Sequence, residues 1–186
     1  MPNWREGLTR NPDTSYTCAY CGNAVGAVWQ WQNNNGSSAA VVCPVCDWAT
    51  VLKGDRQFPG VKFGGDVAGL SADVAALYAE ARDCMGASAH TAAVLLCRKI
   101  LMHVAVETGA DAGRKFVEYV QYLWDEHYVP PNAKGWVDHI REKGNEANHE
   151  IRLMSRAEAE QLISFTEILL QLVYELPQRV PGTTQP

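Results

Sequence analysis

The stretch Gly135–Arg152, which reads GWVDHIREKGNEANHEIR, carries two stripes of side chains at helical spacing. The apolar stripe consists of Trp136, Val137, Ile140, Ala147 and Ile151. The polar stripe consists of Arg141, Asn145, Asn148, His149 and Arg152. Positions three, four and seven apart share one face of a helix, so we expect one face to pack against other helices. The other face would gather a titratable imidazole, two guanidinium groups and two amides, which makes it a candidate site.

Helical periodicity continues on both sides of this stretch. It predicts further helices over residues 71–86, 88–108, 113–128 and 155–176. Ser71 and Ser88 are suitable N-caps, and Ser155 with Glu158 forms a capping box. Pro177 is expected to end the last helix. We therefore predict a mainly α fold, in which residues 71–176 form an all-α bundle of five helices and residues 177–186 form a disordered tail.

Two of these expected helices are apolar over nearly their whole circumference. Residues 88–108 and residues 155–176 present apolar side chains that a bundle of five helices covers only in part. We therefore expect a homodimer, with the helix over residues 135–152 near its interface.

Two pairs of cysteines precede the helical region. Cys18 and Cys21 form one Cys-x2-Cys turn, Cys43 and Cys46 form another, and 21 residues separate the two pairs. Four thiolates at this spacing predict one tetrahedral Zn(II) site on a β hairpin, as in a zinc ribbon over residues 1–54 with a linker over residues 55–70. Four cysteine ligands leave no open position for a substrate, so we expect structural zinc.

Aromatic residues are frequent in this N-terminal region. They are Tyr16, Tyr20, Trp29, Trp31 and Trp48. Such rings can stack on nucleobases, but few basic residues accompany them. The alternatives are that they form the small core of the ribbon or a surface that docks a protein.

Composition excludes several classes of protein. The net charge is −5, so no overall positive field attracts nucleic acid. No segment has the roughly 18 uninterrupted apolar residues of a membrane span, and the N-terminus lacks the apolar core of a secretory signal. We therefore expect a cytoplasmic protein. Cys84 and Cys97 fall on apolar helical faces and are expected to be inert buried thiols.

Residues 80–111 (EARDCMGASAHTAAVLLCRKILMHVAVETGAD) and residues 136–150 (WVDHIREKGNEANHE) resemble the bacterial domain-of-unknown-function family 4145. The second segment contains a Gly-Asn-x-x-x-His signature, and the resemblance covers about residues 70–175. The family is similar to the HEPN superfamily, which implies an all-α domain that is often dimeric. HEPN domains are common in toxins, restriction systems and phage defence, and many are metal-independent ribonucleases with an Arg-x(4–6)-His motif.

The resemblance makes His149 a candidate catalytic base for RNA cleavage. At the spacing that the motif requires for Arg this chain has Lys143, whereas Arg141 lies further from His149. Either cation would stabilise the developing charge on the phosphate, and Asn145 would orient the reacting groups. The alternative is that Asn145 and His149 form a structural polar lock. Two hypotheses follow: a non-catalytic protein- or nucleic-acid-interaction module of a bacterial or phage conflict system, or a metal-independent endoribonuclease.

Overall fold

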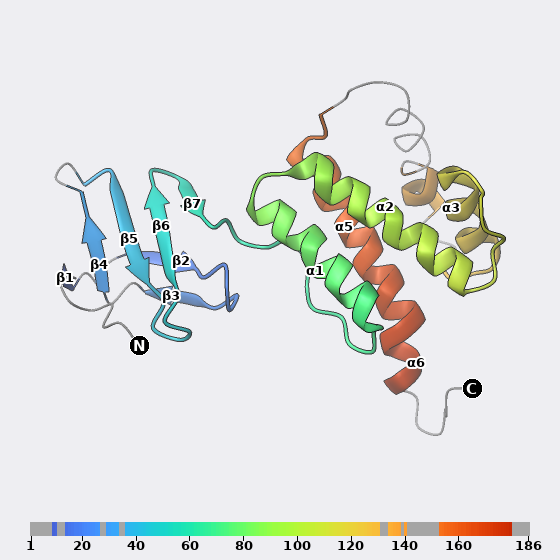
Figure 1. The fold of residues 1–186 in the computed structure, drawn as a ribbon, viewed down its shortest axis with the longest axis horizontal. Coiled ribbons are helices and arrows are strands. Elements are labelled where there is room, and N and C mark those ends of the chain that lie inside the picture. Colours follow the sequence, from blue (N-terminus) through green and yellow to red (C-terminus); the bar gives the residue numbers. More distant parts are fainter. Residues whose placement is uncertain are drawn as a thin grey trace. The chain divides into compact units, whose positions relative to one another are not determined.

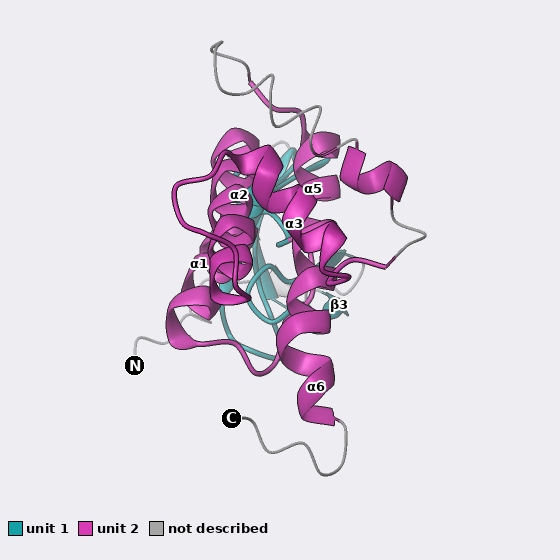
Figure 2. Cartoon of the chain, turned by 90° about the vertical axis from the view of Figure 1, so that its right-hand side faces the viewer, with its two compact units in different colours: residues 1–62, 85–88 teal, residues 63–84, 89–186 magenta. Residues whose placement is uncertain are grey.

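The computed structural model shows a chain with two compact units, an N-terminal one built on β strands and a helical one (Figure 1). It describes residues 9–10, 14–26, 29–33, 36–130, 134–138, 140 and 153–179. The first unit consists of the described residues up to 62 together with residues 85–88. The second unit consists of residues 63–84 and the described residues from 89 onward (Figure 2). Each unit has its own buried core.

The main sheet of the first unit is antiparallel. Its strands are β1 (Thr9–Arg10), β4 (Trp29–Gln32), β5 (Ser38–Val42), β6 (Ala49–Lys53) and β7 (Arg56–Phe58), in the spatial order β1-β4-β5-β6-β7. The hairpin predicted between the cysteine pairs is confirmed by β4 and β5, in which Trp31 pairs with Ala40. Strand β7 follows β6 and turns back to pair with it, so that Phe58 lies opposite Val51.

A second, smaller sheet lies within the same unit. It pairs β2 (Ser15–Thr17) with β3 (Ala24–Gly26), on either side of the first cysteine turn. The Gln57 side chain donates a hydrogen bond of 2.8 Å to the carbonyl oxygen of Thr17, and Thr14 donates to Gln30. These bonds tie the small sheet to strands β7 and β4 of the main sheet.

The second unit is helical. Its labelled helices are α1 (Ala72–Gly86), α2 (His90–Glu107), α3 (Phe116–Asp125), α5 (Arg156–Leu170) and α6 (Leu176–Arg179). Helix α2 packs against both α3 and α5, which cover part of its apolar circumference. Its residues Ile100, Leu101 and Val104 are fully buried, and so are Leu123 of α3 and Ile163 of α5. No helix in the described ranges is both long and apolar enough to cross a membrane.

The predicted caps have mixed outcomes. The Ser155 hydroxyl accepts from the Glu158 amide, and the Glu158 carboxylate accepts from the Ser155 amide, which confirms the capping box. Ser71 likewise accepts from the Val74 amide. The prediction for Ser88 is wrong, because Ser88 adopts a left-handed conformation with φ 59° in the turn and helix α2 starts two residues later. Helix α3 is shorter than predicted and ends before His127, which is also left-handed.

The prediction that Pro177 ends the last helix is also wrong. Helix α5 continues into the π-helical turn η2 (Gln171–Glu175) and then α6, which contains Pro177. In the wide turn the Leu176 amide donates to the carbonyl oxygen of Gln171, five residues back. A proline lacks the amide hydrogen for a regular helical bond, and such a wide turn absorbs this defect without breaking the helix.

The segment Phe63–Gly69 has no regular secondary structure but is attached to the helices of its own unit. The Arg82 guanidinium donates to the carbonyl oxygens of Phe63 and Gly64, and it also pairs with Asp66. Further along, the Ala68 amide donates to the Glu175 carboxylate at 3.1 Å. The second half of the expected linker therefore belongs structurally to the helical unit.

Candidate metal centre and other candidate sites

The two cysteine pairs meet at one point in the first unit. The Sγ atoms of Cys18, Cys21, Cys43 and Cys46 all lie within 4.8 Å of one another. The Sγ atoms of Cys18 and Cys46 are 3.6 Å apart, and those of Cys21 and Cys43 are 3.7 Å apart. Zinc–sulfur bonds of about 2.3 Å in a tetrahedron would place the sulfurs about 3.8 Å apart. The four cysteines are therefore close enough to hold a metal ion, and their spacing is consistent with zinc.

The same backbone turn builds both halves of this centre. In the first turn the Cys18 amide donates to Asn23 and the Cys18 carbonyl oxygen accepts from Gly22, both at 2.9 Å. In the second, Cys43 makes the equivalent bonds with Trp48 and Asp47, both at 3.0 Å. The turns place each pair of thiols on the same side of the chain, and the pairing of the flanking strands brings the two turns together.

The thiols differ in acidity. Hydrogen bonds from Asn23 lower the pKa of Cys21 to about 6, whereas burial raises the pKa of Cys46 to about 12. Burial, followed by the charge of the cysteines, raises the pKa of the Tyr16 hydroxyl. A metal binds thiolates, so filling this centre must release protons and metal affinity falls with falling pH.

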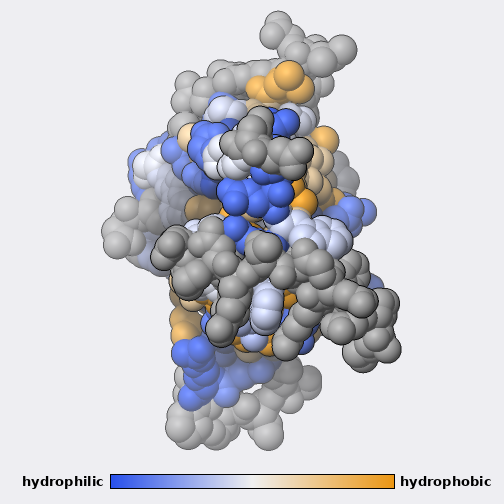
Figure 3. Space-filling view, turned by 90° about the vertical axis from the view of Figure 1, so that its left-hand side faces the viewer, coloured by the Kyte–Doolittle hydropathy of each residue, from blue (hydrophilic) through white to orange (hydrophobic). Residues whose placement is uncertain are grey.

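Apolar and aromatic side chains are exposed beside the four clustered cysteines. Tyr20 lies between the first two cysteines and stacks on Trp48, with ring centroids 5.0 Å apart and planes at 19°. Trp48 is 59% exposed, and Val45, between the second two cysteines, is exposed as well. Tyr20 and Trp48 therefore do not form the core of the ribbon, which leaves the two surface roles for them. Figure 3 shows hydrophobic residues exposed among hydrophilic ones on one side of the molecule.

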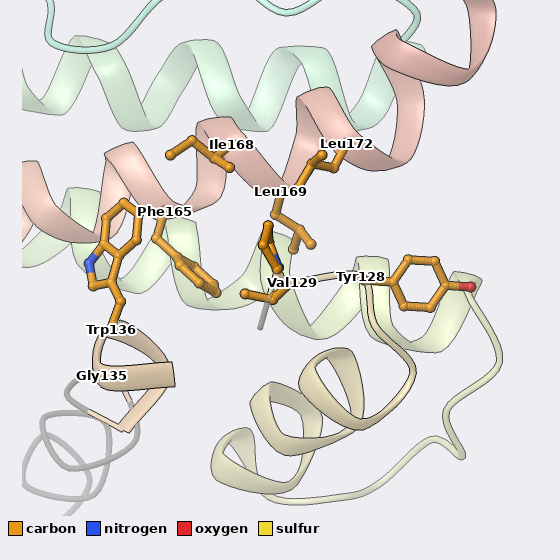
Figure 4. Close-up of a pocket in the computed structure, with 9 residues that line it drawn as sticks. Tyr128, Val129, Gly135, Trp136, Phe165, Ile168, Leu169 and Leu172 are labelled. Atoms are coloured by element: carbon orange, nitrogen blue, oxygen red, sulfur yellow. The ribbon is translucent and has the colours of Figure 1, made fainter. Parts of the chain in front are cut away.

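The helical unit contains an apolar pocket of about 380 Å³ (Figure 4). Its lining consists of Tyr128, Val129, Pro130, Gly135, Trp136, Phe165, Ile168, Leu169 and Leu172. Trp136 meets Phe165 edge to face, with ring centroids 5.3 Å apart. The pocket has the shape and polarity to take an apolar group, and the Tyr128 hydroxyl points away from the other lining side chains.

The proposed catalytic stripe cannot be placed. His149, Arg141, Lys143 and Asn145, together with Asn148 and Arg152, lie outside the described residues. The start of the same predicted helix is described: residues 134–138 and 140 are helical, and Val137 and Ile140 are buried. The apolar stripe therefore faces the core at its N-terminal end, as predicted.

A second titratable cluster, absent from the sequence predictions, lies between α2 and η2. The Tyr174 hydroxyl donates to the Glu107 carboxylate, and His103 Nε2 lies 3.7 Å from a Glu107 oxygen. Burial, aided by Glu107, raises the pKa of Tyr174. His103 and Glu107 are four residues apart on one helix, a spacing that the sequence shows. Tyr174 is 67 residues from Glu107, so no local sequence pattern indicates the bond between these two residues.

Of the two thiols in the helical unit that were predicted to be buried, Cys97 is buried and Cys84 only partly so. Cys97 is fully buried, and burial raises its pKa to about 12. Cys84 is half-buried, and its pKa is also raised by burial.

Comparison with known proteins adds one match. A family model described as a domain of unknown function (DUF4145) matches residues 79–185. No curated protein and no solved structure matches the chain.

Proposed function

The chain belongs to the DUF4145 family of domains of unknown function, and we propose that it is a non-catalytic binding module in which zinc holds the N-terminal unit in shape. Its ligand is a protein or a nucleic acid, bound on the surface of the ribbon. The resemblance of the helical unit to the HEPN superfamily supports a role in a bacterial or phage conflict system.

The observation that carries this proposal is the exposed stack of Tyr20 on Trp48 beside the metal ligands. Large aromatic side chains supply much of the binding energy at interfaces, because they bury a large area and lose little conformational freedom. A metal centre that fixes the backbone of both turns also fixes these rings before a partner arrives. Pre-organised groups of this kind lower the entropic cost of binding.

A structural role for zinc is favoured by the donor set. Four thiolates complete a tetrahedral sphere, whereas catalytic zinc sites keep one position for water or substrate. A module as small as the first unit buries little apolar area, and a metal ion compensates for this. Zinc therefore contributes folding free energy, and through the turns it supports the binding surface.

Support for a binding role also comes from the pocket of the helical unit. Among the described residues, its lining is apolar apart from the Tyr128 hydroxyl, which points away from the other side chains, and it includes no acid, histidine, lysine or arginine. General acid–base catalysis requires a titratable group within reach of the substrate. The pocket thus suits the apolar part of a ligand better than it suits a reaction.

The test compares wild type with a Tyr20→Ala/Trp48→Ala double variant. Each tagged protein is loaded with zinc and incubated with a bacterial lysate, and captured nucleic acids and proteins are both identified by sequencing and mass spectrometry. We expect the double variant to lose a ligand that wild type enriches. A Leu153→Ala variant serves as control, because Leu153 is exposed on the helical unit. Equal capture by wild type and the double variant would refute the proposal.

We also propose that two copies of the chain associate through the helical unit. Leu95 and Val106 are exposed on α2, and Ile168 is exposed on α5. Exposed apolar groups on packed helices are typical of surfaces that a partner covers. Light scattering should give twice the chain mass of 20.5 kDa. A constant monomer mass over the accessible range of concentration would refute the dimer.

A further inference from the structure

A row of apolar side chains crosses four adjacent strands of the main sheet. The register pairs Trp31 with Ala40, Ala40 with Val51, and Val51 with Phe58. Directly paired residues lie on the same face of a sheet, so the four side chains form one continuous row. Trp31 is 53% exposed, Val51 45% and Phe58 46%, whereas Ala40 is half-buried. The row thus has a large aromatic residue at each end and small side chains between them.

The opposite face of the same strands is the covered one. Gln30, Val41 and Thr50 alternate with the row and are buried. This covered face is the one that carries Gln30 and Gln57, which bond to Thr14 and Thr17 near the small sheet. An antiparallel sheet with one covered face normally exposes polar residues on the other. The aromatic row departs from this rule, and exposed apolar patches mark binding surfaces.

Two basic residues border the row on the same face. Lys53 and Arg56 pair directly with each other. Each lies two residues along its strand from Val51 or Phe58, and therefore on the same face. Both are exposed, and the Arg56 guanidinium lies over the Phe58 ring, 5.0 Å from its centroid, so that a base at Phe58 would contact the ring and this cation together. Among the described residues of strands β4 to β7, none on this face is acidic. The acidic Asp55 lies in the turn that joins β6 to β7.

The dimensions of the row suit a short length of an extended strand. Neighbouring strands lie about 4.8 Å apart, so Trp31 and Phe58 are about 14 Å from each other across three such steps. The row of Lys53 and Arg56 lies about 7 Å away along the strands. Surfaces that bind single-stranded nucleic acid combine aromatic platforms for the bases with cations beside them for the backbone. This face has both features in parallel rows.

We propose that this face binds single-stranded nucleic acid, with bases stacked on Trp31 and Phe58 above Ala40 and Val51, and phosphates at Lys53 and Arg56. The inference rests on the proposed function, a binding module, and it names the class of ligand. An apolar protein segment would also cover the row, but it would offer no anion to Lys53 and Arg56, and the described residues of β4 to β7 supply none on this face. The pairing of aromatic and basic rows therefore favours nucleic acid over protein.

The test measures binding of zinc-loaded full-length protein to fluorescent oligouridine and oligothymidine of about 12 nucleotides, which is longer than the row of about 14 Å requires. We expect Trp31→Ala and Phe58→Ala each to weaken binding by about tenfold, because each removes the aromatic platform on which one base stacks. The Lys53→Ala/Arg56→Ala variant should reduce the slope of log affinity against log salt by about 1.4, since each phosphate contact on a single strand contributes about 0.7.

Controls separate this surface from general effects. Leu153→Ala removes an exposed apolar residue of the helical unit, and Lys99→Ala/Arg156→Ala removes two exposed positive charges there. Both should bind the oligonucleotides as wild type does. Every variant is checked for bound zinc and for its circular dichroism spectrum, so that loss of folding is recognised.

The possible results distinguish this inference from the proposed function. Wild type that binds neither oligonucleotide at low salt overturns the inference, and so does binding that Trp31→Ala and Phe58→Ala leave unchanged. If the oligonucleotides do not bind but a protein is captured and lost in the Trp31→Ala variant, the face is a protein site. In that case the inference is wrong, and the binding module stands if the Tyr20→Ala/Trp48→Ala variant loses the same protein. If nothing is bound in either experiment, both are wrong.

Discussion

Asp47 repeats, in the second cysteine turn, the left-handed backbone conformation that Gly22 adopts in the first. Their φ angles are 59° and 71°, and each residue directly follows the second cysteine of its pair. Glycine adopts this conformation without penalty, whereas a residue with a Cβ atom is strained there and aspartate is among those that tolerate it best. The two halves of the metal centre are therefore equivalent in shape but not in intrinsic strain.

This difference predicts unequal responses of the two positions to substitution. A Cβ atom at Gly22 would meet no atom within 4 Å, so Gly22→Ala adds conformational strain and no clash. It should lower the stability of the metal-loaded ribbon by about 1 kcal/mol. Asp47→Gly should change that stability by less than about 0.5 kcal/mol, because relief of strain offsets a more flexible unfolded chain. Competition for zinc with a coloured chelator measures both, and a larger loss for Asp47→Gly would contradict the prediction.

Zinc content is the next prediction. Purified reduced protein should contain one zinc ion per chain, because the four thiols form a single closed site. A Cys43→Ser variant should lose the metal, while Cys84→Ser, which changes a thiol of the helical unit, should keep it. Chelation should abolish order in the ribbon and leave the helical circular dichroism signal, since the helical core is built without these cysteines. Elemental analysis without zinc, or helix loss on chelation, would count against this account.

Arg82→Ala should destabilise the helical unit more than Arg114→Ala does. Arg82 donates to two backbone carbonyl oxygens and to Asp66, so its removal leaves these acceptors without their partner, at about 1–3 kcal/mol. Arg114 makes an exposed ion pair with Asp111, and such pairs contribute about 0.2–1 kcal/mol. Urea unfolding followed by helical circular dichroism gives both values, and equal losses would show that the segment Phe63–Gly69 adds no stability.

The buried thiol of Cys97 predicts a loss of stability at alkaline pH. Its pKa is raised from 9.0 in the unfolded chain to about 12 by burial, so the unfolded state loses its proton first. Stability is therefore full below pH 9 and falls between about pH 9 and pH 12, by up to about 1.4 kcal/mol per pH unit.

The comparison with Cys97→Ala isolates this contribution. The difference in unfolding free energy between wild type and Cys97→Ala should shrink as the pH rises through this range, while other ionising groups affect both proteins alike. A difference that stays constant from neutral to alkaline pH would show that Cys97 is accessible to solvent in the folded state.

RNA cleavage is the outcome that decides between the binding module and its enzymatic alternative. We expect wild type to leave a mixed RNA pool intact and His149→Ala to lower stability by about 1–3 kcal/mol, as loss of a structural polar lock would. A ribonuclease would be established if wild type cleaves RNA and the cleavage rate falls by about a hundredfold or more in His149→Ala, with the melting temperature unchanged. Arg141→Ala and Lys143→Ala would then identify the cation, and His127→Ala, which removes an exposed histidine, is the control.

Features that depend on neighbouring residues were predictable from the sequence. The spacing of Cys18 to Cys21 and of Cys43 to Cys46 defines the two turns, and the capping box of Ser155 needs only Glu158. The periodic apolar residues of α1 and α2 likewise identify the faces that are buried. In each case the interacting groups lie within one turn or one helix, so local chemistry decides the structure.

Features that depend on distant residues were not predictable. The alternation of side chains along a strand places Trp31 on one face of the sheet, but it does not show which face is covered. The opposite face is the covered one because Gln30 and Gln57 on it bond to Thr14 and Thr17, which are distant in sequence. The bond of Tyr174 to Glu107 joins residues 67 positions apart. The wide turn before Pro177 is a further case, because the sequence contains the proline that opposes the helix but no mark of the turn that accommodates it.

The attachment of Phe63–Gly69 to Arg82 and Glu175 bears on how the chain can be divided. The family match begins at residue 79, in the middle of α1, yet the helical unit uses residues from Phe63 onward. A Cβ atom at Gly64 would come within 2.9 Å of the Tyr78 hydroxyl, so this segment lies tightly over the helix. A fragment that starts at residue 79 would lack the first half of α1, including the buried residues Val74 and Tyr78, and would expose the side chains that they cover. Expression of the helical half alone should therefore start at or before residue 63, and shorter fragments should be prone to aggregation.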